Sequence, residues 1–322
     1  LPTVATGNVH AARPRDVQLA QAFAAVRARR SLSDMEGWLA PLSYLRSGAE
    51  MAHRFRRYPG AVARSVEFAE QTVFDLRRAA PQLPVQEVPE GHTPMSWLRE
   101  LVRRGADKLY AHNRSFAEER LQRELAVIES KDFAGYFLIV RDIVAEARRR
   151  GILCQGRGSA ANSAVCYALE ITAVDSIFYN LPFERFLSAS RDEEPDIDVD
   201  FDSERREEII QWVYEKHGRR NAAQVANIIT YRPRSAVRDM AKALGYSVGQ
   251  QDAWSKQIDS WTHLNDSVDV PERVRDLARE AIGAPRHRGI HSGGMVLTRR
   301  PVGEVVPIEH ARMIGRTVVQ LD

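Results

Sequence analysis

Hydrophobic and polar residues alternate strictly along residues 195–202, which read Pro-Asp-Ile-Asp-Val-Asp-Phe-Asp. Because successive side chains of a β-strand point to opposite faces, this period of two predicts a strand that buries Ile197, Val199 and Phe201 and presents four carboxylates on its other face. Such a face can converge on a pair of divalent metal ions. It can equally be a solvated acidic edge that prevents aggregation, and the strand alone does not decide between these interpretations.

Apolar residues recur at helical spacing along much of the remaining chain. The pattern predicts helices over residues 15–30, 62–78, 93–110, 116–129, 135–150, 204–216, 233–244, 248–260 and 271–282, with Thr93 and Ser203 as N-caps. Short strands are predicted at residues 3–6, 152–154, 225–231, 295–297 and 317–321. The Pro- and Gly-rich segment 80–92 predicts a domain boundary. We therefore expect a mixed α+β chain, broadly α/β in class.

Residues 152–163 combine a short apolar strand, a turn that contains Gly156 and Gly158, and a helix predicted to begin at Ser159. Backbone N–H groups and the positive end of the helix dipole would meet at this turn, where they could hold a phosphate, and Arg157 could add charge. An ordinary strand-to-helix turn explains the glycines equally well, so phosphate binding stays open at this point.

Two arginines, Arg185 and Arg191, precede the acidic strand by a few residues. Both are close enough in sequence to reach a ligand held there. Arginine at a protein surface more often pairs with a neighbouring carboxylate, and Glu184, Asp192 and Glu193 are available.

Composition and charge indicate a globular protein. The chain has 322 residues, 44% of them hydrophobic, and a net charge of +3 from 46 Lys+Arg and 43 Asp+Glu, so it can form two or three domains. Cys154 and Cys166 lack CxxC spacing, so neither a zinc site nor a disulfide framework is supported. No apolar run approaches the roughly 20 residues of a membrane span, and we expect a cytoplasmic protein. Because the chain opens on Leu1 rather than Met, we expect a piece of a longer one.

Five segments carry a family resemblance. They are residues 133–140 (FAGYFLIV), 156–159 (GRGS), 183–187 (FERFL), 195–201 (PDIDVDF) and 291–294 (HSGG). In this order and spacing they resemble the bacterial C-family DNA polymerases, the polymerase III alpha subunits. Their amino-acid sequences are most similar to those of the error-prone, damage-tolerant branch.

The resemblance implies a palm of the polymerase-β nucleotidyltransferase type. Residues 1–80 would be the C-terminal part of a PHP domain with the helices that follow it, 93–203 the first part of the palm, 204–285 a helical thumb, and 286–322 a truncated return to the palm.

The resemblance also implies site residues. Asp196 and Asp198 match the family's two metal-binding catalytic aspartates, which implies two Mg²⁺ ions held by hard oxygen ligands. Asp200 and Asp202 match no catalytic position. The positions implied to bind the nucleotide are Arg157, Gly158, Ser159, Arg185 and Arg191. The thumb arginines expected on DNA phosphates are Arg232, Arg234 and Arg238.

The implied activity is template-directed DNA synthesis, in which a two-metal site transfers a nucleotidyl group from a dNTP to a primer 3′-hydroxyl, here in error-prone translesion synthesis during damage-induced mutagenesis. Primer-template DNA and dNTP are the expected partners. A sliding clamp and mutagenesis accessory proteins would bind through regions absent from this chain, and no membrane is involved. The family's third catalytic aspartate lies in a Lys-Phe-Asp stretch that would follow Asp322, so we expect this chain alone to be inactive.

Two alternatives come from other classes of protein. The first is a non-catalytic DNA-binding module with a structural acidic strand, and a Lys-Phe-Asp stretch soon after Asp322 would argue against it. The second is a PHP-type metal phosphoesterase. Residues 6–10 (TGNVH) resemble the last strand of that domain, but Asn8 replaces the aspartate of its Asp-x-His metal pair, so no phosphoesterase metal site is expected.

Overall fold

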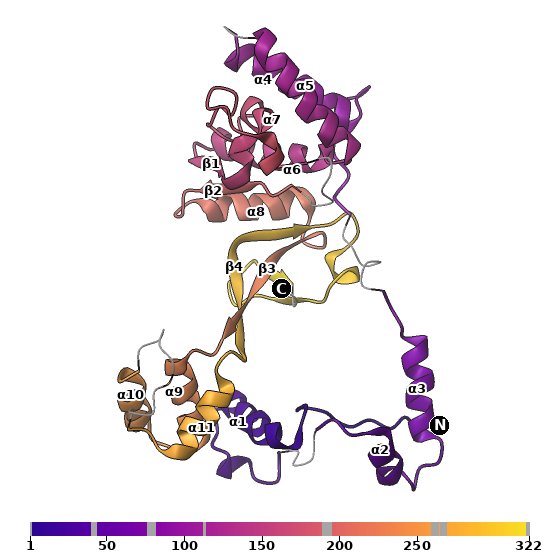
Figure 1. The fold of residues 1–322 in the computed structure, drawn as a ribbon, viewed down its shortest axis with the longest axis vertical. Helices are drawn as coiled ribbons and strands as arrows, with labels where there is room; N and C mark the ends of the chain where they lie inside the picture. The colour runs from indigo at the N-terminus through magenta and orange to yellow at the C-terminus, as the bar shows by residue number, and fades with distance from the viewer. Residues whose placement is uncertain are drawn as a thin grey trace. The chain divides into compact units, whose positions relative to one another are not determined.

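The chain forms two compact units in a computed structural model, which describes residues 2–39, 44–75, 82–111, 114–188, 195–258, 264 and 269–319 (Figure 1). The first unit comprises Leu1–Arg78 and Asn227–Gly289, and the second comprises Ala79–Ala226 and Ile290–Asp322. The division after residue 78 falls next to the boundary predicted at residues 80–92. Helices together with two small sheets confirm the mixed α/β class.

A group of helices forms the main core of the second unit. They are α4 (Pro94–Leu109), α5 (Arg114–Ser130), α6 (Ala134–Arg149) and the short α7 (Ala164–Ala168). The predicted start of α4 is confirmed, since Thr93 accepts the Ser96 N–H and a proline occupies the first turn. At Gly105, α4 approaches α7 so closely that a Cβ would overlap the carbonyl oxygen of Ala168. Leu98, Phe137 and other apolar side chains are fully buried between these helices.

A two-stranded antiparallel sheet lies beside this core. It pairs β1 (Cys154–Arg157) with β2 (Asp198–Phe201), in a register that places Arg157 opposite Asp198. Helix α8 (Arg206–His217) follows, and its Ile209 packs in one apolar cluster with Ala147 of α6. The second unit therefore includes residues 204–226, which the family resemblance assigned to a thumb; the names palm and thumb stay predictions.

A four-stranded sheet completes the second unit and leads into the first. Its strands are β3 (Ala222–Thr230), β4 (Pro285–Leu297), β5 (Ile308–His310) and β6 (Thr317–Val319), in the order β4-β3-β6-β5. β6 pairs with β3 in parallel and with β5 antiparallel. Because the units divide at residues 226 and 289, β3 and β4 each pass from one unit into the other.

The first unit has its own core. It is built by α1 (Val17–Ala28), α9 (Pro233–Ala243), α10 (Val248–Lys256) and α11 (Glu272–Ala281). The ring of Phe23 stacks on Tyr231 with 5.5 Å between centroids. The N-terminal part of this unit adds α2 (Gly48–Arg54) and α3 (Ala61–Gln71).

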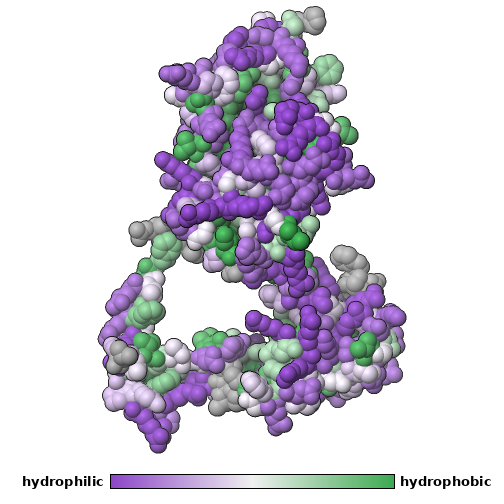
Figure 2. Space-filling view, turned by 180° about the vertical axis from the view of Figure 1, so that it is seen from behind, coloured by the Kyte–Doolittle hydropathy of each residue, from purple (hydrophilic) through white to green (hydrophobic). Residues whose placement is uncertain are grey.

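Two observations concern the prediction that the chain has no membrane span: the character of its surface and that of its helices. Figure 2 shows that hydrophilic side chains cover most of the visible face, with apolar residues scattered among them. In the part of the chain that the structure describes, no helix has both the length and the apolar character needed to cross a bilayer.

Several local predictions are wrong, including the helix predicted over residues 62–78, which ends at Gln71; three more concern two short strands and the start of α8. Residues 3–6 are not a strand; the N–H of Ala5 donates to the carbonyl of Ala61 at 3.0 Å, and no ladder forms around it in the described residues. The strand predicted at 152–154 starts only at Cys154 and runs on to Arg157, because its partner is the acidic strand.

The last of these errors concerns the start of α8, where Ser203 does not act as the N-cap. The carboxylate of Asp202 accepts the Glu204 N–H at 3.0 Å, and its carbonyl accepts the N–H groups of Arg205 and Arg206. Asp202 therefore stabilises the start of α8, and its carboxylate does not belong to the exposed acidic face of β2.

Candidate active site

The acidic face of β2 is exposed and its apolar face is covered. Ile197 is 8% exposed, whereas the side chains of Asp198 and Asp200 are 49% and 66% exposed. Beneath the strand, Val199 and Phe201 help to line an apolar cavity of about 370 Å³ that α6, α8 and β4 also border. The predicted alternation is confirmed in part: Ile197 is buried, whereas Val199 and Phe201 are only half-buried. The carboxylates of Asp196, Asp198 and Asp200 are exposed and open to a ligand.

Hydrogen bonds with two side chains hold the peptide group that follows Asp196, between the two candidate aspartates. The carbonyl oxygen of Asp196 accepts a hydrogen bond from the Ser159 hydroxyl at 3.0 Å. The N–H of Ile197, in the same peptide group, donates to the Tyr136 hydroxyl at 3.4 Å. Burial raises the pKa of Tyr136, so the group stays a hydroxyl. No local sequence pattern indicates that Tyr136 and Ser159 hold this peptide group on its two sides and so orient Asp196 and Asp198.

The turn that contains Gly158 lies next to the carboxylate of Asp198. Gly158 adopts φ +63°, which favours glycine, and a Cβ there would lie 3.6 Å from Oδ2 of Asp198. Arg157 donates Nε–H to Oδ1 of Asp200 at 2.9 Å, and its Nη2 lies 3.9 Å from Oδ2 of Asp198. These exposed ion pairs contribute only about 0–1 kcal/mol, so a phosphate can compete for Arg157. Gly156 has a different role, since a Cβ there would come within 2.6 Å of the carbonyl oxygen of Ile171.

The prediction of a single helix that begins at Ser159 is wrong. A 3-10 helix covers Gly158–Asn162, and α7 begins only at Ala164. The carboxylate of Glu124 accepts the N–H groups of Ala164 and Val165, each at 3.1 Å, and the hydroxyl of Ser163 at 2.8 Å. The positive end of α7 is therefore occupied by the protein's own carboxylate, and only the N–H groups of the 3-10 turn remain for an anion.

Glu124 belongs to a buried network that sequence inspection missed. The residue is 0% exposed, and burial raises the pKa of its carboxyl while the Arg120 guanidinium, bonded through Nε at 2.6 Å, opposes that shift. Arg120 also donates Nη2–H to the carbonyls of Asn162 at 3.2 Å and Leu181 at 2.9 Å. The pair thus ties the end of the glycine turn to the segment that leads into Phe183–Arg185.

The two arginines predicted near the strand have different outcomes. Arg185 is exposed at the end of the 3-10 helix Phe183–Arg185, and its guanidinium has no partner among the described residues. Glu184, its nearest candidate partner in sequence, lies 3.9 Å from Arg123 instead. Arg191 lies outside the described residues.

The donor set suits a hard divalent cation. Within the described ranges no group of three or more His, Cys, Asp or Glu side chains is placed to hold a metal ion. Mg²⁺, however, is commonly held by one or two carboxylates together with substrate phosphates. The exposed carboxylates of Asp196 and Asp198, beside a turn that can receive phosphate, fit that pattern.

Comparison with known proteins identifies the family. Residues 96–322, more than two thirds of the chain, match the sequence profile described as the bacterial DNA polymerase III alpha NTPase domain. The chain belongs to the bacterial DNA polymerase III alpha family. The family resemblance read from the motifs is thereby confirmed.

Similar proteins carry one name. The chain is 61% identical to a protein of Cutibacterium acnes and 57% identical to one of Nocardia farcinica, each over 100% of the chain and 29% of the relative. It is 56% identical to a protein of Mycobacterium tuberculosis H37Rv, over 99% of the chain and 30% of the relative. All three relatives are named error-prone DNA polymerase. The chain thus spans less than a third of the length of the curated relatives it matches.

In this DNA polymerase III alpha chain, the arginines expected on DNA lie at helix α9 of the first unit. Arg238 donates Nη2–H to Asp252 at 2.9 Å and to Ser255 at 3.3 Å, so it links α9 to α10. Arg234 is exposed and has no partner among the described residues, and Arg232 is the N-cap of α9. Arg234 is therefore better placed than Arg238 to meet a DNA phosphate.

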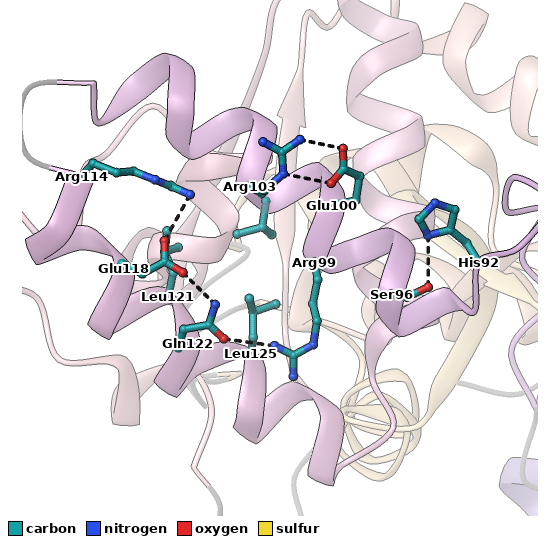
Figure 3. A pocket seen from close by; sticks show the side chains of 11 residues that line it. His92, Ser96, Arg99, Glu100, Arg103, Arg114, Glu118, Leu121, Gln122 and Leu125 are labelled. Carbon is teal, nitrogen blue, oxygen red and sulfur yellow. Dashed lines mark hydrogen bonds and ion pairs between the residues drawn. The ribbon is translucent and has the colours of Figure 1, made fainter.

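A second concave surface of the DNA polymerase III alpha domain lies between α4 and α5 (Figure 3). The cavity measures about 300 Å³, and its charged side chains bind one another. Arg103 pairs with Glu100 at 2.9 Å and Arg114 with Glu118 at 3.1 Å, while Arg99 donates to Gln122 at 3.2 Å. Because each of these arginines already has a polar partner, the pocket is a weaker candidate active site than the β1–β2 surface.

Proposed function

We propose that this chain is the part of an error-prone DNA polymerase that carries two catalytic aspartates and the turn that receives the nucleotide. The reaction is template-directed: the primer 3′-hydroxyl attacks the α-phosphate of a dNTP, and pyrophosphate leaves. The observation that supports the proposal best is the exposed pair Asp196 and Asp198 beside the Gly158 turn, with the Asp196–Ile197 peptide group hydrogen-bonded on both sides. Family membership and the names of the relatives agree with it.

Each site residue has a proposed role. Asp196 and Asp198 hold Mg²⁺, which when bound makes the primer hydroxyl a better nucleophile and stabilises charge on the phosphates. Arg157 moves from its exposed pairs to the triphosphate, while Gly158 leaves room for a phosphate beside the carboxylates. Ser159 contributes its backbone N–H, since its hydroxyl already holds Asp196.

The wider organisation follows the family resemblance. We propose that residues 93–203 and 286–322 contribute to the palm and 204–285 to the thumb, and that residues 1–80 are the end of a PHP domain. Arg191 is a further candidate for the nucleotide, and Arg232 and Arg234 for the DNA backbone. A sliding clamp and mutagenesis accessory proteins would act through other parts of the full-length protein.

The proposal is tested by primer extension with the full-length protein, because the chain spans under a third of its relatives. Extension is expected on an undamaged template and past a template lesion, and only with divalent metal. DNA binding without any extension would favour the non-catalytic DNA-binding module. Release of phosphate from a phosphomonoester without nucleotide incorporation would favour the PHP-type phosphoesterase.

Arg185→Ala in the full-length protein is expected to raise the KM for dNTP by about tenfold or more, because a charge-assisted hydrogen bond to phosphate contributes about 1.5–3 kcal/mol. The measurement is steady-state incorporation across a range of dNTP concentrations.

Glu184→Ala, at the neighbouring position on the same exposed turn, serves as the control and should leave the KM unchanged. An unaltered dNTP dependence in Arg185→Ala would remove Arg185 from the nucleotide site.

A further inference from the structure

A small cavity outside the candidate active site lies between α5 and the turn formed by residues 175–181. Phe116, Glu119 and Arg123 of α5 line it together with Ser176, Ile177 and Asn180 of the turn, and its volume is about 190 Å³. Pockets that hold drug-sized ligands measure about 300–1,000 Å³. This one has room for a fragment such as a single heterocyclic ring system.

One exposed aromatic residue lines this cavity, and two more lie next to lining residues in the sequence. Phe116 is 60% exposed, and Phe178 and Tyr179, which stand between two of the lining residues, are 77% and 63% exposed. The rings of Phe178 and Tyr179 meet edge to face at 5.0 Å, an arrangement that leaves ring faces open to a ligand. Scattered exposed aromatic residues are ordinary, but Phe116 in the cavity wall and the exposed pair Phe178 and Tyr179 on the adjoining turn offer ring faces for stacking.

The turn that carries two of these rings is fixed in place. Oδ1 of Asp175 accepts the N–H groups of Ile177 at 3.0 Å and Phe178 at 3.1 Å, and it also accepts the hydroxyl of Tyr110 at 3.0 Å. The N–H of Leu181 closes the turn on the carbonyl of Ser176 at 2.8 Å. The aromatic platform is therefore preorganised, and a ligand need not spend binding energy on ordering it.

Polar groups at the cavity lack good partners. Ser176 is 1% exposed, and its hydroxyl has no hydrogen-bond partner among the described residues. A buried hydroxyl without a partner is unfavourable, so a ligand that bonds to it gains affinity. Arg123 is 57% exposed. Its ion pair with Glu184, at 3.9 Å, is long and exposed and therefore weak, so the charge of Arg123 is available to an incoming phosphate.

We propose that this cavity and its aromatic rim bind an unpaired strand of DNA. One base enters the cavity between Phe116 and the turn, a neighbouring base stacks on Phe178 or Tyr179, and Arg123 contacts a phosphate. Stacking suits any base, because every base has a π-face. Arg120 bonds the carbonyls of Asn162 and Leu181, so the glycine turn and this turn are joined in one framework.

The inference rests on the proposed polymerase function only for the origin of the strand, which is the unpaired template. The test therefore measures contact with DNA separately from synthesis. The full-length protein is irradiated with three probes that carry 5-iodouracil: a single strand, the overhang of a primer-template, and a blunt duplex. Crosslinked peptides are then mapped by mass spectrometry.

Crosslinks at Phe116 or within residues 176–180 are expected with the single strand and the overhang, and not with the duplex. Phe178→Ala is expected to lower the crosslinking yield and the affinity for the single strand by about tenfold. Phe68→Ala is the matched control, because this phenylalanine of α3 is 59% exposed, and it should change neither. Phe178 is so exposed that its loss leaves the core intact.

Crosslinks confined to other segments, or a Phe178→Ala variant that behaves like Phe68→Ala, would overturn the inference. Crosslinks of the duplex at these residues would overturn it too. Primer extension is measured on the same preparations. Crosslinking at this turn by a protein that never extends a primer would support the strand site while refuting the polymerase proposal.

Discussion

Asp198→Asn in the full-length protein is expected to abolish Mg²⁺-dependent primer extension while primer-template binding persists. The side chain is exposed beside the Gly158 turn, so the change removes a charged oxygen ligand without disturbing the core. Loss of an outer-shell partner of a metal typically costs about 10–100-fold, and loss of a direct carboxylate ligand should cost more. Asp196→Asn should have the same effect. Single-nucleotide incorporation and filter binding measure the two quantities.

Two matched variants separate the metal role from a general effect of charge. Glu204→Gln removes one exposed negative charge a few residues beyond the strand and should extend primers normally. Asp200→Asn should lose far less activity than Asp198→Asn, because Asp200 matches no catalytic position of the family. Extension by Asp198→Asn near the wild-type rate would refute the assignment of the pair.

Glu124→Ala is expected to destabilise the second unit by about 3 kcal/mol and to loosen α7. The substitution leaves the N–H groups of Ala164 and Val165, the hydroxyl of Ser163 and part of the Arg120 guanidinium without their acceptor in a buried site. Urea unfolding measures the stability, and hydrogen exchange at the two amides reports on the start of α7. Their exchange should become faster in native conditions.

Two further variants show whether the effect comes from the network. Glu124→Gln keeps acceptor oxygen for the helix start and should cost less than Glu124→Ala. Glu119→Ala, on the exposed side of the same helix, should change stability by less than about 0.5 kcal/mol. Unchanged exchange at Ala164 and Val165 in Glu124→Ala would show that the carboxylate does not hold α7.

Local patterns predicted the elements well where the signal lies within a few residues. Alternation along residues 195–202 is a direct consequence of strand geometry, and it located the exposed carboxylates of Asp196, Asp198 and Asp200 correctly, but not that of Asp202. The Thr93–Pro94 start of α4 is likewise a short-range signal, and the structure places the cap there. The family motifs added the pairing of Asp196 with Asp198, which alternation alone could not choose from four candidates.

The contacts that position the site join residues far apart in the sequence, so local sequence patterns could not predict them. Ser159 reaches Asp196 across 37 residues, and Tyr136 reaches Ile197 across 61. Arg120 and Glu124 stand four residues apart on a helix, the usual spacing of a surface ion pair, so their burial was not predictable without the packing of α7. The helix predicted at Ser159 failed for the same reason, because Glu124 sets where α7 begins.

The division of each unit into two stretches of sequence affects how the chain folds as it is synthesised. The helices α4–α7 need nothing beyond about residue 199 to bury their core, so they can pack early. β3, in contrast, waits for β6 at Thr317–Val319, and α1 waits for α9 and α11. Pairings so distant in sequence slow folding and leave apolar surface open in the meantime. A nascent chain halted between β3 and β6 would hold one finished helical core while β3 still lacked its β6 neighbour.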